Sequence, residues 1–458
     1  MLSCWKMSIM QNKLIKYFQK CSLLLKNLLC FFAVMLATDM AYGQKNDFPF
    51  APVKVVEIHS AENATGPCEP SISINPRKPS ELVAASVLNN VYTSKNGGKT
   101  WKKSKLASKF GVYGDPVVRF DVKGNVYYSH LANSKGKAYS SAEFLDRIVV
   151  QKSTDKGKSW NEGTYPPVNH NKDHDKQWKA LDPQDNAILM SWTEFDVYGS
   201  KDPKNKSRIL FSVSNDDAEQ WEPALVVSDS EGDCLDGDNT LEGAHPAVGT
   251  DGTYYLVWSW NQKIYMDIST DKGKTWGRDI VIADQPGGWA FEVPGIGRCN
   301  GFPVIKCDHS RGPNRGTLYV QWSDQRNGTH DTDVWMIRSR DGGKSWSKPL
   351  RINDDAPGKQ QFFSWMDIDQ VTGSLYMVYY DRRNHDDNST DVWLSWSDDG
   401  GTSFKHTRIT EEAFIPEENV FFGDYNDVSA HNGKIRPMWT QQRGRVLSVH
   451  TAIIDRLK

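Results

Sequence analysis

Residues 153–160 read Ser-Thr-Asp-Lys-Gly-Lys-Ser-Trp, and variants of this octapeptide recur along the chain. The Asp side chain can accept backbone N–H groups, the Gly tolerates a positive φ and the aromatic ring can pack into the layer beneath, so each copy predicts a tight hairpin turn. Six copies share the pattern Ser-x-Asp-x-Gly-x-x-Trp with mild departures, at residues 94–101, 153–160, 214–221, 269–276, 339–346 and 397–404.

The spacing of these copies predicts a repeat architecture. Their first residues lie 59, 61, 55, 70 and 58 positions apart, which favours one ring of similar units over separate domains. Alternating strands flank each turn, as at 333–337 and 349–352, and two further strand-like runs precede each hairpin, as at 246–248 and 254–258. Each period is therefore predicted to be a four-stranded antiparallel sheet, and radial repetition of such sheets makes an all-β propeller.

Counting the innermost hairpins gives seven blades. The last hairpin, residues 424–440, is followed by a third strand at 447–453, and no turn motif comes after it. The run Val53–Ile58 precedes the first complete blade and is the most economical source of the missing fourth strand. We therefore predict seven blades, with the ring closed by the N-terminal strand in the last blade. Six blades are the alternative.

The first 43 residues are predicted to be a signal peptide. Lysines precede the apolar run 28–37, and Ala41-Tyr42-Gly43 places small residues where a signal peptidase cleaves. The apolar run is too short for a lasting membrane anchor. We expect residues 44–458 to be a single β-propeller catalytic domain that is exported to the periplasm or secreted, and that acts as a monomer.

Composition limits the partners and cofactors. Without the leader the chain is mildly acidic, which argues against a nucleic-acid partner. We expect neither a metal centre nor a cofactor, although the oxygen-rich segment 233–239 makes a structural calcium ion the alternative. Four cysteines remain outside the leader and permit two disulfides in any of three connectivities: Cys68, Cys234, Cys299 and Cys307.

The recurrent octapeptide resembles the Asp box (BNR repeat) of the sialidase-like β-propeller superfamily, and the resemblance covers nearly all of residues 44–458. In such propellers the box lies on the face opposite the usual active site, so the resemblance implies a structural role for it. The Phe-Arg-Ile-Pro start of sialidases is absent, because the matching region reads Gly66-Pro67-Cys68-Glu69-Pro70. The chain looks more like the seven-bladed, polysaccharide-degrading branch, whose members include ulvan-type lyases, rhamnosyl-glucuronate-cleaving enzymes and oligosaccharide dehydratases.

Candidate site residues fall on loops that meet at one mouth of a propeller. Asp-x-Arg at 324–326 and Asp-Arg-Arg at 381–383 could place Arg326, Arg382 and Arg383 where they bind a carboxylate or sulfate. The alternative is that each arginine pairs with its neighbouring aspartate and braces the loop. The starts of the innermost strands carry the remaining candidates: Glu69, Asp115, Lys176, Trp178, His245, Trp365, Asp424 and Tyr425.

Proton abstraction beside a carboxylate is the chemistry that fits these residues. Arg382 would neutralise the carboxylate of a uronic acid, and His245 or Tyr425 would handle protons. Arg326, Arg383, Lys176, Trp178, Trp365, Asp115 and Glu69 are the predicted substrate-binding residues.

We accordingly predict a secreted enzyme that acts on anionic, uronate-containing oligo- or polysaccharides by β-elimination, as a lyase or an oligosaccharide dehydratase. One alternative is an exo-acting glycoside hydrolase of the sialidase or rhamnosidase type. In most hydrolase families two carboxyl groups flank the glycosidic bond. The other is a non-catalytic glycan-binding propeller.

Overall fold

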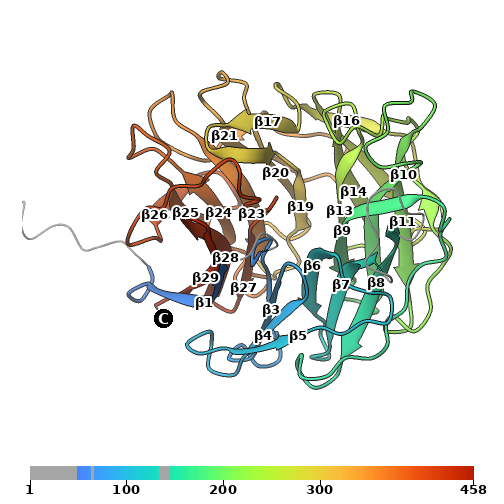
Figure 1. Ribbon diagram of the computed structural model, residues 1–458, viewed down its shortest axis with the longest axis horizontal. Coiled ribbons are helices and arrows are strands. Elements are labelled where there is room, and N and C mark those ends of the chain that lie inside the picture. The colour runs from blue at the N-terminus through green and yellow to red at the C-terminus, as the bar shows by residue number, and fades with distance from the viewer. Residues whose placement is uncertain (1–48, 63–65, 134–143, 458) are drawn as a thin grey trace, which may run out of the picture. The chain divides into compact units, whose positions relative to one another are not determined.

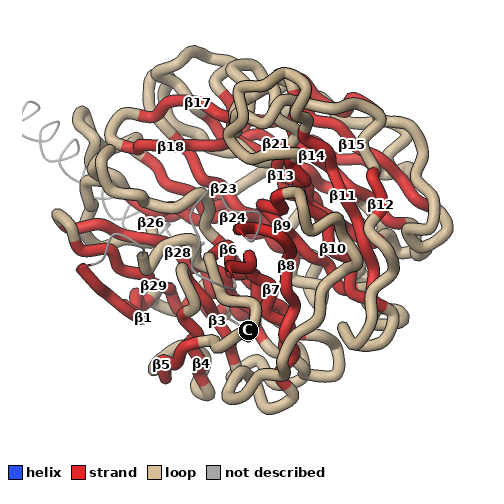
Figure 2. The backbone as a smooth tube through the Cα atoms, turned by 45° about the vertical axis from the view of Figure 1, so that its right-hand side comes forward, coloured by secondary structure: helices blue, strands red, loops and turns tan. Residues whose placement is uncertain are grey.

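The computed structural model describes residues 49–62, 66–133 and 144–457. Residues 51–456 form one compact unit, in which the described elements are strands, turns and loops (Figure 2). The predicted signal peptide, residues 1–43, lies outside the described residues. Within the described ranges no helix is long and apolar enough to cross a membrane.

Seven antiparallel sheets surround a central axis and build a β-propeller (Figure 1). In blades 1 to 6 the strands follow one another in chain order, and the first strand of each blade packs beside the first strands of its neighbours. The innermost position therefore belongs to the first strand of each sheet. The prediction of seven blades is confirmed, and the six-bladed alternative is wrong.

The strands of blades 1 to 3 are β2 (Ser71–Ile74), β3 (Leu82–Ser86), β4 (Asn90–Ser94) and β5 (Lys102–Lys105); β6 (Gly114–Phe120), β7 (Val126–Asn133) and β8 (Phe144–Ser153); and β9 (Asp173–Leu181), β10 (Ile188–Phe195), β11 (Ser207–Ser214) and β12 (Leu225–Val226). Blades 4 and 5 consist of β13 (Glu242–Val248), β14 (Tyr254–Trp260), β15 (Lys263–Ser269) and β16 (Ile280–Asp284), and of β19 (Val304–Cys307), β20 (Leu318–Asp324), β21 (Asp333–Ser339) and β22 (Leu350–Arg351). Blade 6 consists of β23 (Gln361–Ile368), β24 (Leu375–Asp381), β25 (Asp391–Ser397) and β26 (Lys405–Arg408), and blade 7 of β27 (Asp427–His431), β28 (Lys434–Arg443), β29 (Val446–Asp455) and β1 (Lys54–Glu62).

Two features depart from a uniform ring. In blade 2 the fourth strand is reduced to a single bridge between Val150 and Thr164. Between blades 4 and 5 the chain forms an additional two-stranded hairpin, β17 (Ala290–Val293) and β18 (Ile296–Asn300).

The two ends of the described chain close the ring. β1 pairs antiparallel with β29 from Lys54 opposite Ile453 to Glu62 opposite Val446, with one register shift near Glu57. The first and last strands therefore lie side by side in the last blade, as predicted. This pairing completes the only blade that is not built from consecutive strands.

The Asp box closes the hairpin after the third strand as expected. In blade 2, Ser153 Oγ donates to Asp155 Oδ1 (2.8 Å), and the same oxygen accepts the backbone N–H of Ser159 (2.9 Å). The box also packs on the preceding blade, because a Cβ at Gly157 would lie 3.1 Å from Val83 in blade 1. The glycine thus provides both the positive φ of 80° and the close approach.

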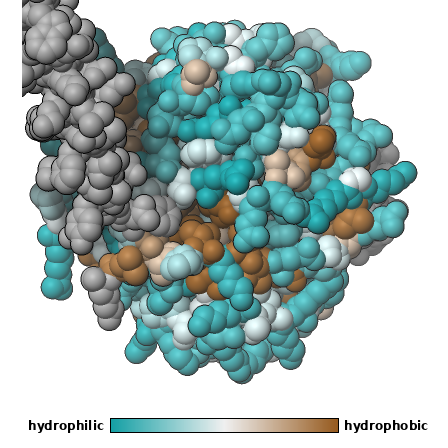
Figure 3. All heavy atoms as spheres, turned by 90° about the vertical axis from the view of Figure 1, so that its left-hand side faces the viewer, coloured by the Kyte–Doolittle hydropathy of each residue, from teal (hydrophilic) through white to brown (hydrophobic). Residues whose placement is uncertain are grey.

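Apolar side chains fill the layers between neighbouring blades. One such layer joins Tyr127 and Ile148 of blade 2 to Trp192 of blade 3, and similar layers follow around the ring. The side of the molecule to which β26 and β1 belong is mostly hydrophilic, with apolar areas between the polar side chains (Figure 3). The core therefore lies between the blades, as ring packing requires.

Candidate functional site

Near the start of the innermost strand, each of blades 1 to 3 has a residue with left-handed backbone geometry. Glu69, Asp115 and Lys176 have φ values of 50°, 49° and 54°. Such a conformation costs a non-glycine residue about 1–3 kcal/mol, and strain of this kind concentrates at functional sites. The pairing register shifts at the same point in blades 2 and 3. Three neighbouring blades therefore present a charged side chain at equivalent positions.

These three side chains line a cavity of about 390 Å³. Its polar lining comprises Glu69, Asp115, Asp175, Lys176, Tyr198, Arg298 and Asp424. Its apolar lining comprises Val87, Leu88, Tyr113, Leu131, Leu145 and Phe421. The structure thus brings together three of the substrate-binding residues predicted from the sequence, at the end of the ring where the innermost strands begin and the Asp boxes do not lie.

Asp424 organises the charges of the cavity. Its buried carboxylate is paired with Lys176 Nζ and accepts from Arg298 Nε at 3.0 Å. Lys176 Nζ also lies 3.6 Å from Asp115 Oδ2. Burial alone would raise the pKa of Asp424, but the charges of Arg298 and Lys176 outweigh it and lower that pKa to about 2. Both cations of the cavity are therefore engaged with carboxylates of the protein.

Arg298 was not predicted from the sequence. It lies on β18, in the hairpin inserted between blades 4 and 5, and reaches Asp424 beside blade 7. Asn300 fixes the same hairpin, because its Nδ2 donates to the backbone oxygen of Asp424 (2.8 Å). The 70-residue spacing between the fourth and fifth Asp boxes, the longest of the series, is the sequence signal that could have indicated this hairpin.

Two carboxyl groups of the cavity hold their protons more tightly than usual. Burial, followed by the charge of Asp115, raises the pKa of Glu69 well above its ordinary value. The same two causes raise the pKa of Asp175 to about 7. Asp115 Oδ2 is buried and accepts no hydrogen bond from any described residue. Groups that favour the neutral and the ionised form thus lie side by side.

A second group of acids lies behind this lining. Asp236 Oδ2 accepts from Tyr198 Oη (2.5 Å) and from Arg298 Nη1 (2.7 Å). Glu242 is fully buried, and neither of its carboxyl oxygens has a hydrogen-bond partner among the described residues. Burial and the charge of Asp236 raise the pKa of Glu242, which favours its neutral form. The surroundings of the cavity are consequently rich in acid groups.

Four other predicted residues form a buried aromatic cluster instead of lining the cavity. Trp178 lies 4.4 Å from Trp365, 4.8 Å from Tyr425 and 6.0 Å from His245, measured between ring centroids. His245 is 1% exposed, and burial lowers its pKa well below the ordinary value, so its imidazole is neutral. Trp178, His245 and Trp365 belong to the innermost strands of three different blades, and Tyr425 lies two residues before that of a fourth.

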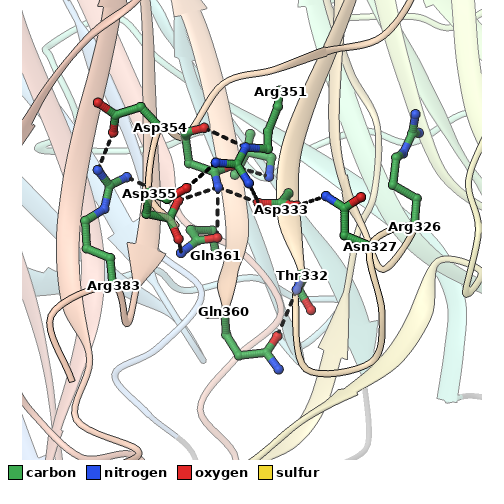
Figure 4. A network of polar contacts seen from close by, with 12 residues as sticks. Arg326, Asn327, Thr332, Asp333, Arg351, Asp354, Asp355, Gln360, Gln361 and Arg383 are labelled. Carbon is green, nitrogen blue, oxygen red and sulfur yellow. Dashed lines mark hydrogen bonds and ion pairs between the residues drawn. The ribbon is translucent and has the colours of Figure 1, made fainter. Parts of the chain in front are cut away.

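The three predicted arginines lie in the loops that follow the second strands of blades 5 and 6, and they do not line the cavity. Arg326 pairs with Asp324 (2.5 Å) and lies over the Trp335 ring at 4.2 Å. Arg383 pairs with Asp381 (2.8 Å), and Figure 4 shows it at one side of a polar network between blades 5 and 6. For Arg326 and Arg383 this is the bracing arrangement that the sequence left open as the alternative.

Arg382 has a different environment. Its side chain is buried, and Nη1 donates to the backbone oxygen of Pro294 (2.7 Å) at the turn of the inserted hairpin. Nη2 is buried without a hydrogen-bond partner among the described residues. Burial lowers the pKa of Arg382 to about 10. The residue therefore supports the hairpin that carries Arg298.

In the candidate calcium segment, residues 233–239, carboxylates accept hydrogen bonds from other groups of the protein. Asp233 Oδ1 accepts from Thr240 Oγ1 (2.7 Å), and Asp238 Oδ1 accepts the Trp289 N–H (3.1 Å). Across the described residues, no three His, Cys, Asp or Glu side chains are arranged to hold a metal ion. The permitted disulfides do not form, because the four cysteines of the described chain are all free and buried.

Comparison with solved structures finds distant similarity. A protein of unknown function from Dyadobacter fermentans is 13% identical with a TM-score of 0.48, and the match covers 89% of this chain and 100% of that one. The NanB sialidase from Streptococcus pneumoniae is 11% identical with a TM-score of 0.49, covering 82% and 83%. The α-L-arabinanase of Penicillium chrysogenum is 14% identical with a TM-score of 0.46, covering 79% and 100%.

No family model and no curated protein matches the chain. The strand order by itself establishes the seven-bladed propeller, and the resemblance to the sialidase-like superfamily stays a prediction. At these identities the similarity extends to the fold alone, and membership of the polysaccharide-degrading branch stays a prediction.

Proposed function

We propose that the protein is a glycoside hydrolase whose active site is the cavity formed by blades 1 to 3, the β17–β18 hairpin and the segment before blade 7. One observation carries this proposal. Glu69 and Asp115 occupy equivalent strained positions of neighbouring blades and line one cavity, and the charge of Asp115 favours the neutral form of Glu69. A carboxylic acid beside a carboxylate is the pair that hydrolysis of a glycosidic bond requires.

Glu69 is assigned as the proton donor. Its neutral carboxyl group would protonate the glycosidic oxygen as the bond to the leaving group breaks. Asp115 is assigned as the carboxylate that either attacks the anomeric carbon or activates water. Lys176, 3.6 Å away, compensates the charge of Asp115 in the free enzyme.

The remaining lining supports a sugar as the ligand. Tyr113 and Phe421 offer aromatic surface, and Leu131 and Leu145 offer aliphatic surface, against which the apolar face of a sugar ring can pack. Phe421 is 44% exposed, which leaves its ring accessible at the rim.

The charges of the cavity favour hydrolysis over β-elimination of a uronate. Elimination needs a cation that is free to neutralise the substrate carboxylate. Lys176 and Arg298 are both paired with Asp424, and Arg326, Arg382 and Arg383 lie outside the lining. An added carboxylate would enter a site that already holds an excess of acid groups.

A panel of aryl glycosides with leaving groups of different acidity tests the assignment. Glu69→Gln should lose about 10²–10⁴-fold in kcat/KM on poor leaving groups and much less on a dinitrophenyl glycoside, which departs without protonation. Asp115→Asn should lose activity on every substrate. Glu194→Gln serves as the control, because Glu194 is a buried carboxylate that does not line the cavity.

The parent enzyme should also lose activity on the alkaline side as Glu69 gives up its proton, and Glu69→Gln should lack that limb. Elimination would release an unsaturated uronate, which absorbs in the ultraviolet. Detection of that absorbance would show that the enzyme eliminates and does not hydrolyse. Binding of oligosaccharides without any cleavage would make the propeller a glycan-binding module.

A further inference from the structure

Positive charge is concentrated in blades 1 and 2. Residues 71–160 contain sixteen Lys and Arg against six Asp and Glu, whereas the whole chain contains 55 against 57. Such asymmetry in one part of a chain indicates an electrostatic binding surface.

Many of these cations lie at the end of the ring that carries the Asp boxes. The innermost strand β2 leads away from the cavity, so the turn after it places Arg77 and Lys78 at the far end. The Asp-box hairpin after β4 returns to the same end with Lys95 and Lys99. The corresponding turns of blade 2 add Lys123, Lys156 and Lys158. These seven exposed residues are here named the basic face.

The two blades contribute to one continuous surface. Arg77 Nη1 donates to the backbone oxygen of Lys123 across the blade boundary (3.4 Å). The box of blade 2 packs directly on blade 1, because a Cβ at Gly157 would lie 3.1 Å from Val83 and 3.2 Å from Thr93. The hairpin that carries Lys156 and Lys158 is thus held against the blade that carries Lys95 and Lys99.

Five of the seven cations of the basic face form no ion pair with a carboxylate of the described residues. Lys78 pairs with Glu81 (3.0 Å) and Lys123 with Asp217 (3.0 Å). For the other five, no carboxylate of the described residues lies within ion-pair distance. Asp155 accepts backbone hydrogen bonds within its own hairpin and forms no ion pair with these five cations. A bound external anion would relieve their mutual repulsion.

The Asp-box hairpin does not require this charge. The equivalent hairpin of blade 3 carries Asp217 and Glu219, and that of blade 6 carries Asp398 and Asp399. All of these boxes form the same turn, since Gly or Ala donates its backbone N–H to the first Ser at 2.8–3.0 Å in blades 2, 3 and 6. The basic face therefore reflects something other than folding of the hairpin.

We propose that the basic face is a second, non-catalytic binding surface for an anionic polysaccharide. Six of its seven cations are lysines, which act as separate point charges and suit repeated carboxylate or sulfate groups. Among the described residues of 71–160, Val122 is the only large apolar side chain in the exposed class, so the surface offers little to insert into a lipid bilayer. It also offers no fully exposed aromatic ring on which nucleic-acid bases could stack. The surface lies away from the cavity and does not depend on the proposed hydrolysis.

Charge reversal in matched pairs tests the proposal. Lys99→Glu/Lys158→Glu changes two lysines of the basic face, and Lys274→Glu/Lys344→Glu makes the same change at the equivalent box position of blades 4 and 5. Binding of immobilised polygalacturonate and dextran sulfate is measured at low salt, with neutral dextran as the reference polymer. The first pair should weaken binding about tenfold or more, and the second should have little effect.

Affinity for the anionic polymers should also fall as salt is added, while dextran should not bind. Equal losses in the two double variants would mean that only net charge matters, and would overturn the proposal. Absence of binding at low salt would overturn it as well. Tighter, Lys99- and Lys158-dependent binding to duplex DNA or to phosphatidylglycerol vesicles would assign the surface to a different partner.

Discussion

Asp424→Asn is the substitution that bears most directly on the organisation of the cavity. The Asp424 side chain is fully buried and bonded to two cations, Lys176 and Arg298, whose side chains are 4% and 35% exposed. An asparagine keeps the shape but removes the charge that these cations share. Both cations retain one other carboxylate, Asp115 for Lys176 and Asp236 for Arg298.

The size of the effect follows from two routes. Removing one partner of a buried ion pair costs about 3–5 kcal/mol, and the remaining carboxylates place this case near the lower end. Lowering the pKa of Asp424 from 3.8 to about 2 corresponds to roughly 2 kcal/mol of stability at neutral pH. The free energy of unfolding of Asp424→Asn should therefore be lower by about 2–3 kcal/mol.

The pH dependence gives the sign. Because the folded-state pKa of Asp424 is depressed, its contribution is fully present above the unfolded value of 3.8 and is lost as pH falls through about 2. Urea unfolding followed by tryptophan fluorescence should show the largest difference between parent and variant near neutral pH and a shrinking difference in acid. Asp284→Asn, in an exposed pair with Lys263, is the control and should remain close to the parent. A difference for Asp424→Asn that is negligible near neutral pH would refute the reasoning.

Three further outcomes are expected. His245→Phe should keep both the melting temperature and the turnover of the parent, because a neutral ring packed between Trp178 and Trp365 is replaced by another ring. A large loss of turnover in a folded variant would show that His245 is a catalytic residue. Asp155→Ala should lower the free energy of unfolding by about 1–2 kcal/mol, because the turn loses hydrogen bonds, and should leave kcat/KM unchanged. A change in kcat/KM would contradict the placement of the Asp boxes away from the cavity. The four cysteines of the described residues are free and buried, so a thiol reagent should modify them only after unfolding, and a reductant should leave the melting temperature unchanged; they are Cys68, Cys234, Cys299 and Cys307.

The fold was predictable because the sequence pattern that specifies each turn is local. In each Asp box the bonded groups lie two and four residues apart, as between Ser153, Asp155 and Gly157, so an eight-residue window contains the whole turn. The reduced fourth strand of blade 2 was not foreseen. Pro166 and Pro167 follow Thr164 there and lack the N–H groups that would continue the ladder, which leaves a single bridge.

The candidate site was predictable only where the repeat itself fixes a position. Glu69, Asp115 and Lys176 lie near the start of successive innermost strands, each at the residue with positive φ, and the repeat identifies that place. Trp178 and His245 lie slightly further along such strands, where the channel is already filled by packed rings. A sequence shows which residues approach the axis of the ring. The depth at which packed side chains close the central channel depends on all seven blades together.

Arg298 illustrates the part of the site that no local pattern contains. Its neighbours on β18 form no motif, and its main partner Asp424 lies 126 residues away in the chain. The contact exists because the hairpin is held at several points, by Arg382 on Pro294 and by Asn300 on the backbone of Asp424. Without Arg298, Lys176 would be the only cation paired with Asp424 among the described residues. Lys176 would then compensate less of the charge of Asp115. The balance of charge in the cavity therefore depends on an insertion that lies outside the repeat, which is why a repeat-based interpretation finds the carboxylates and misses the cation that balances them.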